Sequence, residues 1–243
     1  MGLAVAWANS ELMKNIAEIG NVRLQHVARD AGDESDPVAS KKFSVKPTLT
    51  GQRVILRPFR DEDFGAMKAA VSDPEVQRLT GAAHSATSET PSEDVTRRWY
   101  ATRNAQNDRL DLAVVDKATG ETVGEVVLNE WDAANNSCSF RTLIGPRERG
   151  RGLGTEAIRL VIGYGFEQLG MHRISLEVYA FNPRARHVYE KVGFVEEGVL
   201  REALRYEDEW VDASVMSILA SEWEQHRGRP EEGRGWRAFP PRT

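Results

Sequence analysis

The chain has 243 residues, which is long enough to bury one sizeable core, and its net charge at neutral pH is -5. Its acidic balance argues against nucleic-acid binding, which needs a dense basic surface. The single cysteine, Cys138, excludes an internal disulfide and a cysteine-rich metal site, and no metal is expected. The lack of a possible disulfide fits a reducing compartment, so the cytoplasm is the expected location. No apolar run approaches the ~20 residues that span a membrane, so no membrane partner is expected.

Composition divides the chain into three predicted regions. Residues 1–46 form an N-terminal extension, partly disordered because its polar stretch 28–42 has too few large apolar residues to fold alone, or holding a short docked helix. Residues 47–223 form the folded domain. Residues 224–243 are rich in Arg, Gly and Pro and form a flexible tail.

The first half of the domain is predicted to be an antiparallel meander with two helices near its start. Asp61 is the expected N-cap of the first helix, whose apolar face begins at Phe64. Thr90 is the expected N-cap of the second helix, with Pro91 at its first position and a polar loop over Leu79–Thr90 between the two. Alternating or apolar runs predict strands over Val54–Leu56, Leu112–Val115, Val123–Leu128 and Cys138–Ile144.

The second half follows a helix–strand–helix pattern and ends in two strands. A buried stripe at helical spacing predicts a helix over Thr155–Leu169. The next helix starts with Asn182 as N-cap and Pro183 at its first position, and Gly193 ends it. Strands are predicted over Ile174–Ala180, Val199–Leu204 and Val211–Leu219.

A glycine-rich stretch before the Thr155–Leu169 helix is the strongest functional signal. Glycines at every second position, 150, 152 and 154, leave the backbone open to a ligand, and the helix N-terminus adds free N–H groups. Arg149 and Arg151 add full positive charges, so the stretch is predicted to bind a phosphate or pyrophosphate.

Several interpretations of this stretch remain open. The run from Gly152 to Ala157 matches a dinucleotide fingerprint, with Glu177 about the right distance further on, but the antiparallel strands before it argue against a Rossmann unit. A Walker A loop is excluded because no Gly-Lys-Ser/Thr follows the glycines. A plain turn with solvated arginines is the remaining structural alternative.

Two blocks in the right order and spacing point to a family. Arg149, Gly152 and Gly154 match a Q/R-x-x-G-x-G/A signature, and residues 182–194 match an N-x-x-A…Y-x-K-x-G-F segment. On these blocks the chain resembles the GNAT superfamily of acyl-CoA-dependent N-acetyltransferases, and it is most similar to the RimJ/RimL-like branch. The resemblance covers roughly residues 49–223. It implies an α/β (α+β) GNAT fold, with a mixed, mostly antiparallel sheet whose central strands splay apart around acetyl-CoA as co-substrate.

The resemblance also implies site residues. The backbone amides from Gly150 to Thr155 would bind the pyrophosphate of coenzyme A, and Leu143 and Ile144 would pair with its pantetheine arm. Asn182 would hydrogen-bond that arm, although a plain N-cap role fits it equally well. The full predicted cofactor-binding set is Leu143, Ile144, Arg149, Gly150, Arg151, Gly152, Leu153, Gly154, Thr155, Asn182, Arg184, Ala185 and Tyr189.

Tyr189 aligns with the tyrosine that assists departure of the CoA thiolate in this family. Its alternative is core packing, because it shares a helical stripe with Ala185 and Val192. An ordinary tyrosine pKa near 10 and thiol pKa near 8.5 make full proton transfer uphill by ~1.5 units, so at least a hydrogen bond to the developing thiolate is expected.

The general base is less evident. Many relatives carry a glutamate where this sequence has Ser139, and no carboxylate replaces it in that strand. Glu130, Asp132 and Glu177 are substitutes, although each pattern fits an exposed strand or loop carboxylate as well. Three histidines are also candidate bases, but no sequence pattern around them indicates a catalytic role: His84, His172 and His187.

The missing base bears on the amine acceptor. At pH 7 a lysine-type amine is ~0.04% neutral and an α-amine roughly 10–17%, so a weak base favours the second. A protein or peptide N-terminal α-amine is therefore the first expectation. The alternatives are an acetyltransferase of small-molecule amines (polyamine, antibiotic or amino-acid) and a non-catalytic acyl-CoA-binding module. The protein is expected to be a monomer or a homodimer.

Overall fold

The computed structural model describes residues 42–85 and 92–227. At its centre lies one sheet with the strand order β1-β2-β3-β4-β5-β6-β8-β7. The strands are β1 (Leu49–Thr50), β2 (Val54–Arg57), β3 (Leu110–Asp116), β4 (Thr122–Asp132), β5 (Ser137–Ile144), β6 (Arg173–Tyr179), β7 (Val195–Tyr206) and β8 (Glu209–Leu219). All neighbouring pairs are antiparallel except β5 and β6, which are parallel, so the predicted mixed, mostly antiparallel sheet is confirmed.

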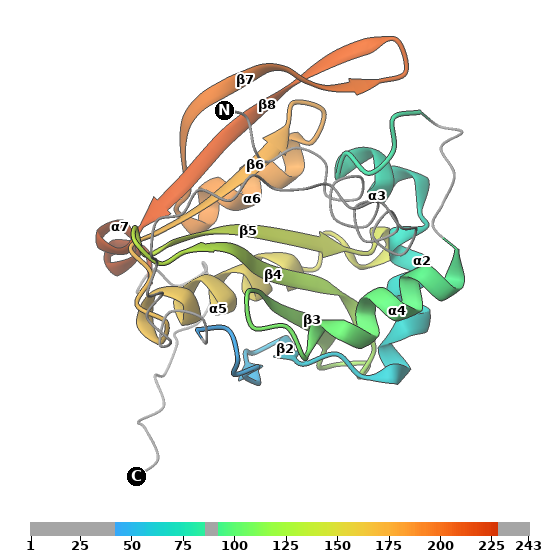
Figure 1. The fold of residues 1–243 in the computed structure, drawn as a ribbon, viewed down its shortest axis with the longest axis horizontal. Helices are drawn as coiled ribbons and strands as arrows, with labels where there is room; N and C mark the ends of the chain where they lie inside the picture. The colour runs from blue at the N-terminus through green and yellow to red at the C-terminus, as the bar shows by residue number, and fades with distance from the viewer. Residues whose placement is uncertain (1–41, 86–91, 228–243) are drawn as a thin grey trace, which may run out of the picture.

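Helices cover both faces of this sheet (Figure 1). Their bounds are α2 (Phe64–Val71), α3 (Pro74–Leu79), α4 (Glu93–Arg103), α5 (Leu153–Glu167), α6 (Pro183–Val192) and α7 (Ala220–His226), with 3-10 turns η2 (Asp61–Asp63) and η3 (Pro146–Glu148). Residues of α5, α6 and α7 share one buried cluster with alternate residues of β2–β6 and β8. Residues of α2, α3 and α4 form a second cluster on the opposite face, with Ala113 of β3 and Leu143 of β5.

The larger cluster begins before the predicted domain start. Phe43 is only 1% exposed and belongs to the core under α5. Its ring lies edge-on to Trp131 with centroids 6.3 Å apart, and the Lys42 ammonium lies 4.3 Å from the Trp131 ring. The segment just before residue 47 therefore packs as part of the domain, while residues 1–41 lie outside the described part of the chain.

Three predicted helix starts differ in detail from the structure. α5 covers Leu153–Glu167 rather than 155–169, because Gly152 with a φ of +80° is its N-cap. Asp61 lies in the 3-10 turn η2, and α2 begins only at Phe64. α4 begins at Glu93 with Ser92 as N-cap, and the predicted cap Thr90 lies outside the described residues. For α4 and α5, a nearby serine or glycine takes the cap position, whereas α2 is preceded by a 3-10 turn that already contains Asp61.

Two short helices were not predicted. Asp73 caps α3 by accepting a hydrogen bond from Val76 N at 3.0 Å, and Pro74 occupies the first position. α7 follows directly after the end of β8 at Leu219. It buries Trp223 against Phe166 of α5, with the ring centroids 6.1 Å apart. Both helices are under eight residues long, so their sequence periodicity is too short to be distinctive.

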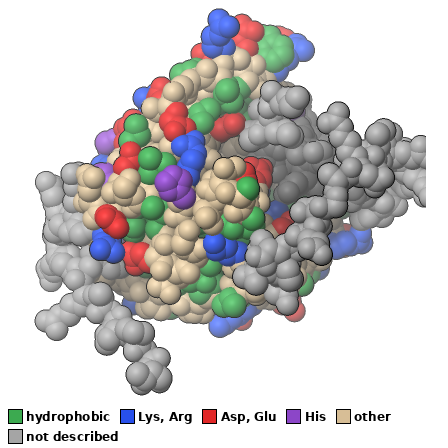
Figure 2. Space-filling view, turned by 60° about the vertical axis from the view of Figure 1, so that its left-hand side comes forward, with side chains coloured by type: hydrophobic (Ala, Val, Ile, Leu, Met, Phe, Trp, Pro, Cys, Tyr) green, Lys and Arg blue, Asp and Glu red, His purple; other side chains and the backbone are tan. Residues whose placement is uncertain are grey.

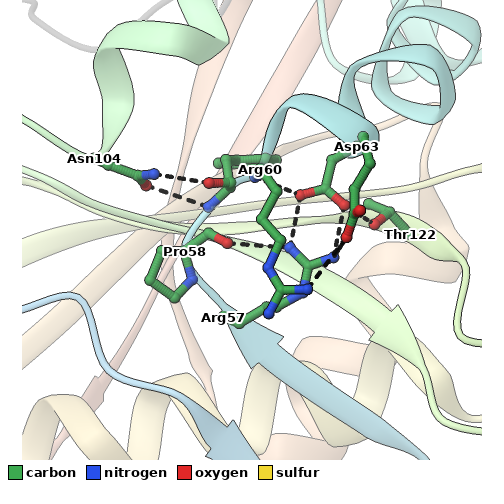
Figure 3. Close-up of polar contacts among 8 residues, drawn as sticks. Arg57, Pro58, Arg60, Asp63, Asn104 and Thr122 are labelled. Carbon is green, nitrogen blue, oxygen red and sulfur yellow. Dashed lines mark hydrogen bonds and ion pairs between the residues drawn. The ribbon is translucent and has the colours of Figure 1, made fainter.

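A buried ion pair joins β2 to the start of α2 (Figure 3). Arg57 donates from both terminal nitrogens to the Asp63 carboxylate, at 2.7 and 2.8 Å. Asp63 also accepts from Arg60 N at 2.7 Å and from the Thr122 hydroxyl of β4. Burial alone would raise the pKa of Asp63, but these hydrogen bonds and the Arg57 charge hold it below its ordinary value.

Candidate functional site

The two parallel strands at the centre of the sheet separate part-way along their length. β5 and β6 pair only from Ser137 with Arg173 to Ser139 with Ser175. Beyond this point β5 continues beside β4 and β6 continues beside β8, and Figure 1 shows β6, β8 and β7 fanning away from β5. The facing backbone edges of the two diverging arms can therefore bind an extended ligand that carries amides. The predicted splay of the central strands is confirmed.

The glycine-rich loop lies at the end of the β5 arm. Gly150 and Gly152 have φ values of +78° and +80°, which side-chain-bearing residues adopt at a cost. A Cβ on Gly154 would lie 3.3 Å from Ile144 Cγ1, so the loop packs closely on the end of β5. The first amides of α5, from Leu153 to Thr155, have no helical acceptor and are available to an anion.

The arginines predicted to add charge to this loop already have carboxylate partners. Arg149 Nη1 lies 2.7 Å from Glu75 Oε2 of α3, and its Nε donates to Ile144 O at 3.3 Å. Arg151 lies 2.6 Å from the buried Asp116 carboxylate and also pairs with Glu148. The two guanidinium charges are thus partly neutralised, whereas the sequence predicts a full positive charge at both positions.

The second sequence block forms α6 beside the β6 arm. Asn182 Oδ1 accepts from Ala185 N at 3.2 Å, so its N-cap role is present. Arg184 is exposed, and Ala185 packs partly buried against the main core. Gly193, with a φ of +117°, ends the helix as predicted.

Tyr189 lies on α6 where the two arms diverge. It is 8% exposed, and its ring is edge-on to Phe140, the first β5 residue after the last pair with β6, with centroids 6.2 Å apart. It also contacts Phe194 at 5.9 Å. Burial raises the pKa of the Tyr189 hydroxyl, so it stays protonated at neutral pH. Core packing is thus a real role of Tyr189, and the position also suits a hydrogen-bond donor at the apex of the splay.

Comparison with known proteins agrees with this geometry. The profile of the Acetyltransferase (GNAT) domain matches residues 53–195. The chain belongs to the GNAT family. The GNAT domain thus spans the diverging strands, the glycine loop and α6.

Individual GNAT relatives include spermidine N(1)-acetyltransferase of Vibrio cholerae, 36% identical over 110 residues, 45% of this chain and 64% of that protein. The chain therefore spans just under two thirds of that relative. The uncharacterized N-acetyltransferase YoaA of Bacillus subtilis is 27% identical over 71% of this chain and 97% of its own length. A crystal structure of the Vibrio cholerae spermidine N-acetyltransferase in complex with CoA and spermine has a TM-score of 0.64 and 26% identity, covering 72% of this chain and 99% of that one.

The face of the GNAT sheet opposite Tyr189 carries the carboxylates at the splay. Ile174, Leu176 and Val178 of β6 lie in the core under α5, so Glu177 points to the other face. Burial, followed by the nearby Glu130 charge, raises the pKa of Glu177 to about 7. Ser139, which replaces the expected strand carboxylate, instead donates a hydrogen bond from Oγ to Glu130 Oε2 at 2.7 Å.

The other candidate bases are held in structural contacts or lie away from the splay. Asp132 accepts from Asn135 N at 3.1 Å and from Asn135 Nδ2 at 2.7 Å, and so caps the turn after β4. His84 Nδ1 lies 2.9 Å from Arg205 O of β7. His172 lies at the start of β6, away from the splayed ends, and His187 is on the exposed side of α6. Of the carboxylates considered from sequence, Glu130 and Glu177 come together.

A further buried acid was missed from sequence. Glu125 of β4 is 2% exposed, and burial together with the Asp111 charge raises its pKa to about 7. The sequence signal was a lone carboxylate inside the apolar run Val123–Leu128. Glu125 lies opposite Leu143 on β5, under the helices of the second cluster.

Surface and metal features complete the description of the GNAT domain. Over residues 42–85 and 92–227, no group of three His, Cys, Asp or Glu side chains could hold a metal ion. In the same residues no helix is both long and apolar enough to cross a bilayer. On the face shown in Figure 2, acidic and basic side chains are interspersed with apolar ones.

Proposed function

We propose that this GNAT protein is an acetyl-CoA-dependent N-acetyltransferase that moves an acetyl group to a primary amine. The observation that carries the proposal is the parting of β5 and β6 after Ser139 and Ser175, between the glycine loop and Tyr189. Acetyl-CoA would supply an activated thioester. The loop amides of Gly150–Thr155 would hold its pyrophosphate, and the free edge of Leu143 and Ile144 would pair with its pantetheine arm.

The residues at the splay suit an acid–base division. Glu177 accepts the proton that the attacking amine loses as the C–N bond forms, because a pKa of about 7 leaves it partly ionised at neutral pH. Tyr189, from the opposite face of the sheet, donates a hydrogen bond to the sulfur as the C–S bond breaks. A retained donor and acceptor favour an enzyme over a non-catalytic acyl-CoA-binding module.

We infer a small-molecule polyamine as the acceptor, rather than the protein N-terminus expected first. That expectation depended on the lack of a base, and Glu177 supplies one. Two neighbouring carboxylates, Glu130 and Glu177, favour a cationic acceptor. The Vibrio cholerae relative is named for spermidine, and its structure is described with CoA and spermine, which supports the same class.

An acceptor panel tests this proposal. Purified protein is given acetyl-CoA with spermidine, spermine, a lysine-free peptide with a free α-amine, or an N-blocked lysine peptide, and free CoA thiol is measured. We expect the polyamines to be turned over fastest. Faster turnover of the α-amine peptide would instead support a protein or peptide N-terminus as the acceptor. Binding of acetyl-CoA by calorimetry without thiol release from any amine would instead indicate the non-catalytic module.

A further inference from the structure

The positive charge at the glycine loop has a source that the sequence motif does not contain. Arg149 and Arg151, the arginines of the motif, are paired with Glu75, Asp116 and Glu148. An arginine held by a carboxylate must loosen that pair before it binds a phosphate, so its charge is worth less to a ligand. A third guanidinium, from Arg53 at the start of β2, lies against the same loop.

The backbone of Arg53 is held firmly to the helix that follows the loop. Arg53 N donates to Glu156 Oε2 at 2.9 Å, and Gln52 N donates to the other oxygen of the same carboxylate. Glu156 is 5% exposed and lies in the first turn of α5. On the other side, Lys117 N donates to Arg53 O at 2.8 Å. These contacts fix the base of the Arg53 side chain relative to the N-terminus of α5.

The side chain itself crosses the loop at Gly152. Arg53 Nη1 donates to Arg151 O at 3.0 Å, and a Cβ on Gly152 would collide with that nitrogen. Among the described residues the Arg53 guanidinium has no carboxylate partner, and the side chain is exposed. It therefore retains its full charge and further N–H donors.

The bond to Arg151 O also orients a backbone donor. The peptide between Arg151 and Gly152 is planar and trans, so its N–H points opposite to its C=O. With the carbonyl turned toward Arg53, the Gly152 N–H points away from that side chain. Arg53 thus sets the direction of one of the loop amides that are available to an anion.

We propose that Arg53 positions the Gly152 amide to bind the pyrophosphate of acetyl-CoA. The assignment rests on the proposed acetyl-CoA-dependent function. It is specific to the pyrophosphate because Arg53 contacts the carbonyl of Arg151, whose peptide carries the Gly152 N–H next to the first amides of α5. No local sequence pattern predicts this contact, because Arg53 lies 98 positions before Arg151 in the chain.

Calorimetric titration with CoA tests the assignment. Wild-type protein is compared with Arg53→Met and with Arg147→Met. Arg147 carries an exposed charge in the same loop and makes no hydrogen bond or ion pair within the described part of the chain. We expect Arg53→Met to weaken CoA binding at least about tenfold, and Arg147→Met less than about twofold. A Kd for Arg53→Met within twofold of wild type overturns the proposal. If the wild-type protein itself does not bind CoA, the proposed function is wrong. If the wild type binds CoA and Arg53→Met binds it equally well, only the role of Arg53 is wrong.

A second ligand and a second variant sharpen the result. Titration with 3′-dephospho-CoA should show the same loss for Arg53→Met; a loss seen only with CoA would assign Arg53 to the 3′-phosphate and overturn the pyrophosphate assignment. If Arg53→Met does not fold, Arg53→Lys replaces it. A lysine lacks the planar guanidinium that holds the Arg151 carbonyl in one direction, so we expect binding to be weaker by about threefold or more, and unchanged binding contradicts the proposal.

Discussion

The Tyr189 ring lies edge-on to the Phe140 ring, with the two centroids 6.2 Å apart. Phe140 is the first residue of β5 beyond its last pair with β6. This contact places a buried hydroxyl at the apex of the splay and fixes its ring by packing. Tyr189→Phe keeps the packing and removes only the donor. We expect kcat to fall about a hundredfold, with the Kd for acetyl-CoA changed less than threefold. Steady-state kinetics and calorimetry check this, and an unchanged kcat would remove Tyr189 from the chemistry.

The ionisation of Glu177 predicts the pH dependence of turnover. With a pKa of about 7, raised by burial and by Glu130, activity should rise with pH through that value as the carboxylate becomes able to accept a proton. Glu177→Gln should remove this limb of the kcat/KM profile and lower the rate about a hundredfold.

Glu130→Gln is the matched companion variant. It retains an oxygen for the Ser139 hydroxyl and removes the charge that raises the pKa of Glu177, so the limb should move to lower pH. A limb near pH 7 that persists in Glu177→Gln would assign it to another group.

Glu125 predicts a pH dependence of stability. Its folded pKa of about 7 lies above the ordinary 4.5, so between these values the unfolded chain binds fewer protons than the folded one. The free energy of unfolding should therefore fall as pH rises from about 4.5 to 7, by up to about 3 kcal/mol. Glu125→Gln should remove that slope, as measured by urea unfolding across pH. The exposed Glu121→Gln should keep it, and an unchanged slope in Glu125→Gln would contradict the prediction.

The Arg57–Asp63 pair predicts a large effect of a small change (Figure 3). Both side chains are nearly buried, with 9% and 2% of their areas exposed. Asp63→Asn therefore removes the buried charge that pairs with Arg57 and leaves only the more distant and exposed Glu62 carboxylate, at 3.7 Å. We expect a loss of about 3–5 kcal/mol in denaturant unfolding. Glu62→Gln, in the same turn but 67% exposed, should cost less than about 0.5 kcal/mol. Because the pKa of Asp63 is lowered, its contribution should be lost as pH falls below the ordinary range of an aspartate.

Two glycines with similar backbone angles separate strain from function. Gly120 has a φ of +76° with open space where a Cβ would be, whereas Gly152 has +80° and faces Arg53 Nη1. Gly120→Ala should cost about 1–2 kcal/mol of stability and leave CoA affinity unchanged. Gly152→Ala should add at least about a tenfold loss of CoA binding, measured by calorimetry. Equal CoA affinities of the two variants would show that the loop does not contact the ligand.

Much of the fold followed from local patterns. Apolar or alternating runs predicted β3–β6, and the Asn182-Pro183 start and Gly193 end of α6 are where the sequence placed them. The short helices α3 and α7 were missed, because fewer than two turns give no distinctive periodicity. The start of α5 was misplaced by two residues, because Gly152 caps it in the left-handed conformation.

The sequence by itself determined the family, the glycine loop and the tyrosine, because each depends on residues within one short block. Only the tertiary structure decided which charges are available. Glu75 reaches Arg149 across 74 positions, Arg53 reaches Arg151 across 98, and the pKa of Glu177 depends on Glu130 from another strand. Periodicity and caps are set by neighbours along the chain, whereas ion pairs and pKa values are set by distance and burial in space.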